Sequence, residues 1–212
     1  MGKSELSLQE TQAMLINLAD RIIASKELLT QADRAIGDGD HGVGMARGFE
    51  AVRSKLANMT ITSLDEAFKV VGTALMTSVG GAAGAVFGTF FRAGARQLGG
   101  RQVFDSEALA LMLSDGLDAV KARGKAEPGD KTMLDALAPA ARQAQALASA
   151  PLDQCLIAVA NAAREGMEAT QDMVARAGKA RSLGERSLGH PDPGAVSTYL
   201  ILKFMMEYVA GD

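Results

Sequence analysis

Three aspartates, Asp33, Asp38 and Asp40, lie within eight residues of one another in the stretch ADRAIGDGDHG. Hard divalent cations prefer carboxylate oxygens as ligands, and Mg²⁺ takes few carboxylates while leaving positions for phosphate and water. Glycines on both sides of Asp38 let the backbone approach a ligand closely. The cluster therefore predicts a Mg²⁺ site, with a solvated acidic turn as the alternative.

The same stretch contains G-x-G-x-x-G at residues 37–42, which is the pattern of dinucleotide-binding loops. That motif requires a strand before the glycines, whereas residues 7–29 have helical periodicity and begin with a capping box. A second stretch, GKAEPGDKT at residues 124–132, is one residue too long for a P-loop and also follows a helical segment. Both motifs are disfavoured, but a helix beginning near Thr132 could receive an anion at its N-terminus.

The dominant hydrophobic period of the chain is helical, and no segment shows the alternation of a β-strand. Eight helices are expected, at residues 7–29, 43–56, 63–76, 85–98, 105–123, 132–148, 151–174 and 195–209. Short connections between successive helices favour antiparallel neighbours. The sequence therefore predicts one all-α domain over residues 1–212, built as an antiparallel array of eight helices.

The connections between these helices alternate in character. Those after the first, third, fifth and seventh helices are rich in glycine and polar residues, and they read GDGDHG, SVGGAAG, RGKAEPGDKT and LGERSLGHPDPG. In an up-and-down array every odd-numbered connection lies at the same end. Functional residues concentrate on loops held by a rigid scaffold, so the four loops predict one site at a single rim. Each loop taken alone also fits an ordinary connector.

The composition excludes several classes of function. A net charge of −3 gives no electrostatic drive toward nucleic acid, and a chain with two Tyr and no Trp offers few stacking platforms for bases. The single cysteine, Cys155, cannot form a disulfide framework. The N-terminus has no apolar signal core and no run reaches membrane-spanning length, so a cytoplasmic protein without membrane contact is expected.

Four motifs in chain order carry a resemblance to a known family: ADRAIGDGDHG, SVGGAAGAVFGTFF, RGKAEPGDKTMLD and LGERSLGHPDPGA. With them the chain resembles the nucleotide-binding L subunit of dihydroxyacetone (glycerone) kinase over nearly its whole length. The resemblance implies an eight-helix antiparallel up-and-down barrel that binds ADP or ATP with two Mg²⁺ at one rim. The implied rim agrees with the one expected from the loops.

The resemblance also assigns roles to single positions. Asp33, Asp38 and Asp40 match the Mg²⁺ ligands of the family. The positions that match its nucleotide contacts are His41, Gly42, Val43, Gly44, Ala82, Ala83, Gly124, Thr132, Met133, Asp192, Pro193 and Gly194. Lys179 matches the basic residue of a flexible loop, which contacts the nucleotide and acts in catalysis, and Arg176 and Arg181 lie near it in the sequence.

The implied function is that of one subunit of a dihydroxyacetone kinase. A partner K subunit of the family holds the ketose, and in members linked to the phosphotransferase system a phosphohistidine-carrying M subunit rephosphorylates bound ADP from phosphoenolpyruvate. A homodimer is also expected.

Three positions differ from the pattern of the linked members. Gly44 and Ala83 lack polar side chains, and Lys179 stands where an arginine would form a bidentate fork on phosphate. The phosphoryl donor therefore stays open at this point. The alternatives are a subunit of an ATP-dependent kinase for another short ketose, and a non-enzymatic regulator that binds nucleotide or lipid.

Overall fold

The computed structural model describes residues 2–211 of the chain. Within them it forms nine α-helices: α1 (Leu8–Ala24), α2 (Lys26–Ile36), α3 (His41–Ala57), α4 (Leu64–Ser78), α5 (Gly81–Gly94), α6 (Ser106–Gly124), α7 (Met133–Ala146), α8 (Leu152–Ala169) and α9 (Pro193–Ala210). Three short 3₁₀ helices complete the helical part: η1 (Arg96–Leu98), η2 (Thr170–Asp172) and η3 (Lys179–Ser187). The all-α fold class expected from the sequence is confirmed.

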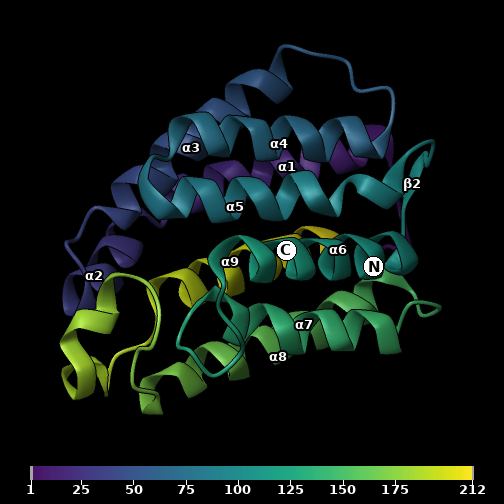
Figure 1. Ribbon diagram of the computed structural model, residues 1–212. Coiled ribbons are helices and arrows are strands. Elements are labelled where there is room, and N and C mark those ends of the chain that lie inside the picture. The colour runs from purple at the N-terminus through teal and green to yellow at the C-terminus, as the bar shows by residue number, and fades with distance from the viewer. Residues whose placement is uncertain (1, 212) are drawn as a thin grey trace.

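Eight of the nine helices form a closed ring (Figure 1). Each of α3 to α8 packs against the next helix along the chain, α1 packs against α3, and α9 returns to α1. The remaining helix, α2, lies beside the ring and contacts α3, α9 and η3. At the far end of the barrel the strands β1 (Leu6–Ser7) and β2 (Val103–Phe104) form an antiparallel pair with Leu6 opposite Phe104.

The expectation of one uninterrupted helix over residues 7–29 is wrong, because the chain breaks at Ser25 into α1 and α2. Ser25 has φ −84° and ψ 6°, and its hydroxyl donates to the carbonyl of Arg21 at 2.8 Å. A serine that bonds back to the preceding turn competes with the regular helical ladder. The break redirects the chain, and α2 then runs on to Ile36, which places Asp33 in its last turn.

Large aromatic side chains fill the barrel and make it rigid. Six phenylalanines are fully or almost fully buried, at Phe49, Phe68, Phe87, Phe90, Phe91 and Phe104. The rings of Phe90 and Phe91 meet edge to face at 4.9 Å between centroids. Burial of each such side chain contributes about 1.5–3 kcal/mol, so the helices form a stiff scaffold for the loops at their ends.

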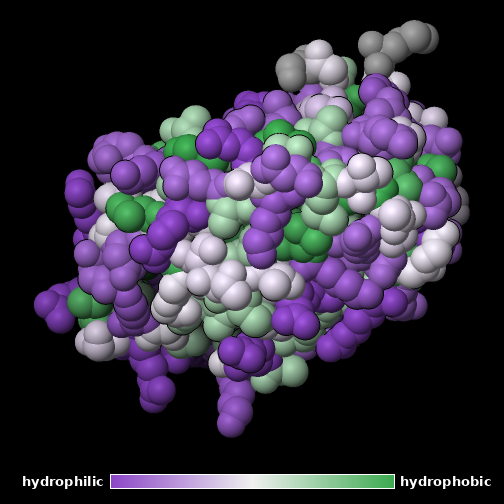
Figure 2. All heavy atoms as spheres, turned by 90° about the horizontal axis from the view of Figure 1, so that it is seen from above, coloured by the Kyte–Doolittle hydropathy of each residue, from purple (hydrophilic) through white to green (hydrophobic). Residues whose placement is uncertain are grey.

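The surface is mostly polar on the face of the molecule drawn in Figure 2. Figure 2 shows one face of the molecule, on which hydrophilic side chains predominate and hydrophobic ones occur singly or in small groups. Among the helices of residues 2–211, none combines the length and the apolar character that a membrane crossing requires.

Candidate functional site

A cavity of about 700 Å³ opens at the rim of the barrel next to α2. Each of the four glycine-rich loops contributes to its lining. The first loop provides Asp38, the second Gly80, the third Lys131 and the fourth Asp192. The loops that the alternating connections assigned to one rim therefore do meet there.

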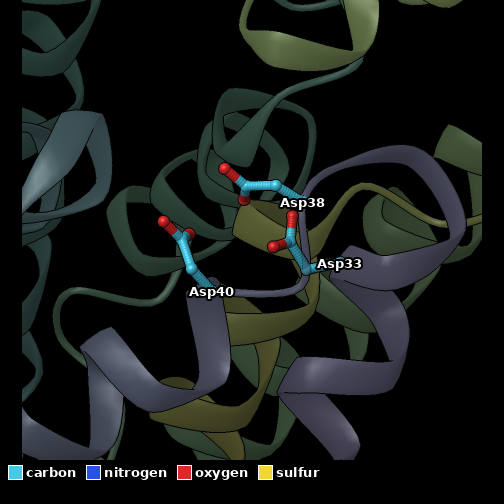
Figure 3. Close-up of side chains that lie close together, drawn as sticks. All are labelled: Asp33, Asp38 and Asp40. Carbon is cyan, nitrogen blue, oxygen red and sulfur yellow. The ribbon is translucent and has the colours of Figure 1, made fainter.

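The three aspartates form one cluster at the mouth of this cavity. Asp33 is buried on the last turn of α2, and Asp38 and Asp40 are largely exposed on the loop between α2 and α3. One carboxylate oxygen from each residue lies within 4.8 Å of the others, and Figure 3 shows the three side chains gathered around one point. Such a set of oxygens at this spacing suits a hard divalent cation such as Mg²⁺.

The backbone around the cluster is shaped to fit the carboxylates. The amide N–H of His41 donates to Asp33 Oδ2 at 3.2 Å and so orients that side chain. A Cβ atom at Gly37 would collide with the Asp33 carboxylate. Gly39 has φ 78°, which is a left-handed conformation that glycine adopts without strain. Both glycines of the loop are therefore needed for the geometry of the three aspartates.

One cationic side chain already touches the cluster. Lys179 Nζ lies 2.5 Å from Asp38 Oδ2 and 3.5 Å from Asp40 Oδ2. The hydrogen bond from Lys179 lowers the pKa of the Asp38 carboxyl, and the same bond raises the pKa of the Lys179 ammonium. The Asp38 carboxyl is therefore held in its anionic form, which is the form that binds metal.

The N-terminus of α5 faces the same cavity. Gly80 and Gly81 have φ values of 83° and 56°, and no side chain caps the helix. Ala82 and Ala83 in its first turn line the cavity. The first amides of a helix lack partners inside the helix and attract anions. This end of α5 is therefore suited to a phosphate group.

Two other helices that begin at the cavity are capped by their own side chains. At α7, Thr132 and Asp135 form a capping box, in which the amide of Thr132 donates to Asp135 Oδ2 at 2.7 Å. At α9, Asp192 Oδ2 accepts from the amide of Ala195 at 2.8 Å. The idea that the helix near Thr132 receives an anion is therefore not favoured, because the Asp135 carboxylate already occupies its N-terminus.

The inner part of the cavity has an apolar wall. Val120, Ala126, Met133 and Leu134 line it and are buried. Gly124 lies at the edge of this wall, with open space where a Cβ atom would stand. An apolar wall of this kind, beside a few well-placed polar groups, is typical of small-molecule sites.

Two ionisable groups at the cavity have pKa values shifted by burial. His41 is buried and its Nε2 lies 2.7 Å from Ser197 Oγ, and removal from water lowers its pKa. Burial raises the pKa of the Asp192 carboxyl to about 7. Both side chains are bonded within the protein, His41 to α9 and Asp192 to the start of α9.

Most of the positions expected from the sequence line this cavity. All three aspartates do, and so do Lys179 and every expected nucleotide contact except Gly42. Gly42 instead lies against α2, where a Cβ atom would collide with the carbonyl of Lys26 and the hydroxyl of Thr30. Its role in this structure is close packing of α3 on α2.

Of the three basic residues in the stretch before the fourth loop, Lys179 lines the cavity, whereas Arg176 and Arg181 do not. Two other basic residues of the lining were missed in the sequence. Arg47 donates to the carbonyls of Ser78 and Val79, both at 2.6 Å, and so closes the C-terminus of α4. Lys131 lies in the GKAEPGDKT stretch that does not fit a P-loop, and a lysine beside a glycine-rich turn is the sequence signal that points to it.

Comparison with known proteins decides the family. The family model described as the DAK2 domain matches residues 35–207. The chain belongs to the DAK2 domain family. The matched region contains α3 to α8 entirely, most of α9, and all four loops of the rim.

Two curated members of this family are similar to the chain over nearly their full length. The PEP-dependent dihydroxyacetone kinase, ADP-binding subunit DhaL, of Escherichia coli (strain K12) is 42% identical over 97% of this chain and 98% of its own. The PEP-dependent dihydroxyacetone kinase 1, ADP-binding subunit DhaL, of Listeria innocua is 35% identical over 91% and 92%.

A solved structure shares the fold. The crystal structure of the dihydroxyacetone kinase from C. freundii in complex with AMP-PNP and Mg²⁺ matches with a TM-score of 0.72 and 28% identity. The match covers 92% of this DAK2 chain but only 33% of the longer kinase chain.

Proposed function

We propose that this DAK2 chain is the ADP-binding subunit of a dihydroxyacetone kinase. One observation carries the proposal: a single cavity joins the carboxylate cluster, the uncapped N-terminus of α5 and an apolar wall. These three parts suit the metal, the phosphates and the base of a nucleotide respectively. The full-length similarity to two subunits named for ADP binding supports the same assignment.

In this proposal Asp33, Asp38 and Asp40 hold Mg²⁺, and their number suits two ions that share carboxylates. Bound Mg²⁺ would neutralise the charge of the polyphosphate and orient it. The α5 amides at Ala82 and Ala83 contact the phosphates, and the wall beside Gly124 and Met133 receives the base. His41, Val43, Gly44, Thr132 and the start of α9 at Asp192, Pro193 and Gly194 complete the pocket.

Lys179 is the catalytic residue of the proposal. Its ammonium lies at the carboxylate cluster on an exposed segment, so it can contact the terminal phosphate and offset the charge that is transferred. Phosphoryl transfer needs little covalent chemistry from the protein and depends on positioning and charge neutralisation. The other residues of the cavity hold the nucleotide and exclude water from it.

The chain has no evident place for the ketose within residues 2–211. Its buried His41 is bonded to Ser197, and its acidic cluster is assigned to metal. We therefore propose that a K subunit holds dihydroxyacetone and docks at the rim of the cavity. Since the two subunit relatives are named PEP-dependent, we propose that an M subunit rephosphorylates the bound ADP. A homodimer of this chain is part of the proposal but rests on the resemblance alone.

A second candidate is an ATP-dependent form of the same kinase. The solved relative from C. freundii is a longer chain that was crystallised with AMP-PNP and Mg²⁺. Its lower identity to this chain, 28% against 42%, favours the PEP-dependent form. A lipid-carrying barrel is disfavoured by the phenylalanines that fill the interior.

The test is the nucleotide that accompanies the purified protein. The chain is gel-filtered, denatured and analysed by mass spectrometry, and we expect ADP near one equivalent per chain. Rapid replacement of that nucleotide by labelled ATP would favour the ATP-dependent form. A preparation that neither retains ADP nor binds it with Mg²⁺ would contradict both forms.

A further inference from the structure

Lys131 is a buried lysine whose ammonium is fully occupied by backbone carbonyls. The residue is 1% exposed in the loop between α6 and α7. Its Nζ donates to the carbonyl oxygens of Thr170 at 2.6 Å, Ser187 at 2.7 Å and His190 at 2.6 Å. A lysine ammonium has three protons to donate. All three are used, so this lysine has none left for a phosphate, even though it lines the cavity.

The three carbonyls belong to the two ends of one segment. Residues 170–190, the lid segment, begin at Thr170 and end at His190, and their middle part from Ala177 to Ala180 lines the cavity. The lid segment is the yellow-green part of the chain that lies beside α2 in Figure 1. Lys131 therefore ties together the beginning and the end of the segment that carries Lys179.

Apolar packing alone gives the lid segment little support. Its buried contacts with α2 are limited to a small cluster of Ile36, Ala175 and Ala180, with Leu183 packed against it. Ala177 also packs against the main core. Hydrogen bonds add further support, among them the bond from the amide of Gly189 to the carbonyl of Gln171 at 2.8 Å. Segments with few buried apolar contacts open more easily than the core, so polar ties decide how firmly this one is held.

Both the backbone conformation and the burial of Lys131 are energetically unfavourable. Its φ of 61° lies in the left-handed region, which is strained for a side chain with a Cβ atom. Removal from water also lowers the pKa of its ammonium. Strained backbone and buried charge persist where the surrounding structure requires them, and they concentrate at functional sites. The neighbouring carbonyl of Asp130 accepts from the amide of Arg176, which adds a second contact to the lid segment.

We propose that Lys131 is a positioning residue that closes the base of the lid segment and thereby places Lys179 at the cavity. Lys131 acts through Lys179 and does not touch the nucleotide phosphates. The part that concerns phosphoryl transfer rests on the proposed function. The part that concerns the lid segment does not, and it can be measured on the chain alone.

The first experiment is limited trypsin digestion of the unliganded chain, followed by mass spectrometry. The lid segment holds four exposed trypsin sites, at Arg176, Lys179, Arg181 and Arg186. Lys131→Met should raise the cleavage rate at these sites by about tenfold, because proteolysis follows the population of the open segment. Lys203→Met, which removes a partly exposed lysine paired with Glu207 on α9, is the matched control and should leave this rate unchanged.

A folding control separates the local effect from a general loss of structure. Lys131→Gln keeps two of the donors and should give an intermediate cleavage rate with helicity unchanged by circular dichroism. Faster cleavage confined to the lid segment in both variants supports the proposal. Cleavage spread over the whole chain, or a lid segment as resistant as in the wild type, would overturn it, because Lys131 would then be a general stabiliser or dispensable.

The second experiment asks whether Lys131 acts through Lys179. Turnover of the complex reconstituted with a K subunit is measured for Lys131→Met, Lys179→Met and the double variant. If one residue positions the other, the double variant is no slower than Lys179→Met alone, and a multiplicative loss contradicts the coupling. If the wild-type complex shows neither ADP binding nor turnover, the proposed function fails, while the digestion result still decides whether Lys131 closes the lid segment.

Discussion

The ammonium of Lys179 lies 2.5 Å from a carboxylate oxygen of Asp38, although 141 positions separate the two residues in the chain. The lid segment and the carboxylate cluster are thereby joined by a direct ion pair. Both side chains are more than half exposed, so the pair is a weak and adjustable contact. A cation that enters the cluster must share Asp38 with Lys179, which makes the position of the lid segment sensitive to metal.

The first prediction concerns this competition. Lys179→Met should tighten the binding of Mg²⁺ measured without nucleotide by a few fold, because the competing ammonium is gone. The same variant should weaken the binding of Mg-ADP, because the contact with the phosphates is lost. Titration calorimetry measures both. Arg181→Met, in the same segment but outside the cavity lining, is the control. If Lys179→Met changed the affinities for Mg²⁺ and for Mg-ADP in the same direction and by the same factor, the competition would be contradicted.

The second prediction concerns the proposed metal ligands. Asp38→Asn and Asp40→Asn should each remove the rise in melting temperature that Mg-ADP gives, while the helicity stays unchanged. A ligand at a hundredfold excess over its dissociation constant stabilises the folded state by about 2.7 kcal/mol. Asp20→Asn, which removes an exposed ion pair with Arg53 on the outside of the barrel, is the control. If Mg-ADP raised the melting temperature of these variants as much as that of the wild type, the metal would be held elsewhere.

The sequence was sufficient for the barrel and for the place of the site. Helical periodicity located the eight ring helices to within a few residues, and the alternation of plain and glycine-rich loops located the rim. The break at Ser25 was not predictable, because serine is neither glycine nor proline and the apolar stripe continues through it. The start of α5 at Gly81 was also missed, since consecutive glycines rarely begin a helix without a cap.

The end of α8, where the lid segment begins, could not be predicted from neighbouring residues. A helix over residues 151–174 was expected, but α8 ends at Ala169 and η2 follows it. The helix ends there because of contacts from residues distant in the chain. Lys131 Nζ donates to the carbonyl of Thr170, and the amide of Asp192 donates to the hydroxyl of Thr170. Patterns of nearby residues cannot report a bond between positions 39 apart in the sequence, such as the one between Lys131 and Thr170.

The third prediction separates ligand binding from stability at the N-terminus of α5. Ala82→Asp places a carboxylate in the exposed first turn of an uncapped helix, where it favours the helix dipole. The melting temperature of the free protein should hold or rise, whereas ADP binding should be lost because the new charge repels the phosphates. Gln9→Asp adds the same charge to the first turn of α1 at the opposite end of the barrel and serves as the control. Retained ADP affinity in Ala82→Asp would place the phosphates elsewhere.

The fourth prediction concerns pH and Asp192. Burial raises its pKa from an ordinary value of 3.8 to about 7, so the folded chain binds a proton that the unfolded chain releases between these values. The contribution of Asp192 to the free energy of unfolding must then fall as the pH rises from about 4 to about 7, and stay level above that. Each pKa unit corresponds to about 1.4 kcal/mol, so the change is on the order of a few kcal/mol.

Asp192→Asn is the variant that tests it. Asparagine keeps the oxygen that accepts from the amide of Ala195, so the cap is preserved. Its side chain does not titrate, so the pH dependence due to Asp192 is removed. Urea unfolding at several pH values should show the wild type losing stability relative to the variant across that window. A difference between the two proteins that stays constant with pH would mean that Asp192 is already ionised in the folded chain.

The last prediction concerns dependence on a partner. A kinase for a small ketose must hold its substrate in line with the terminal phosphate, and positioning alone can be worth roughly 7–11 kcal/mol of the barrier. It also needs a base within reach of the substrate hydroxyl, and that base is usually His, Asp or Glu. The buried imidazole of His41 is bonded to Ser197, and the nearby aspartates of the cluster are assigned to metal.

The chain alone, loaded with Mg-ATP, should therefore phosphorylate dihydroxyacetone at no measurable rate in a coupled assay, and a K subunit should restore transfer. Addition of albumin at the same concentration controls for non-specific effects. Turnover by the chain alone, at a rate ordinary for kinases, would show that it carries its own ketose site and that the subunit assignment is mistaken.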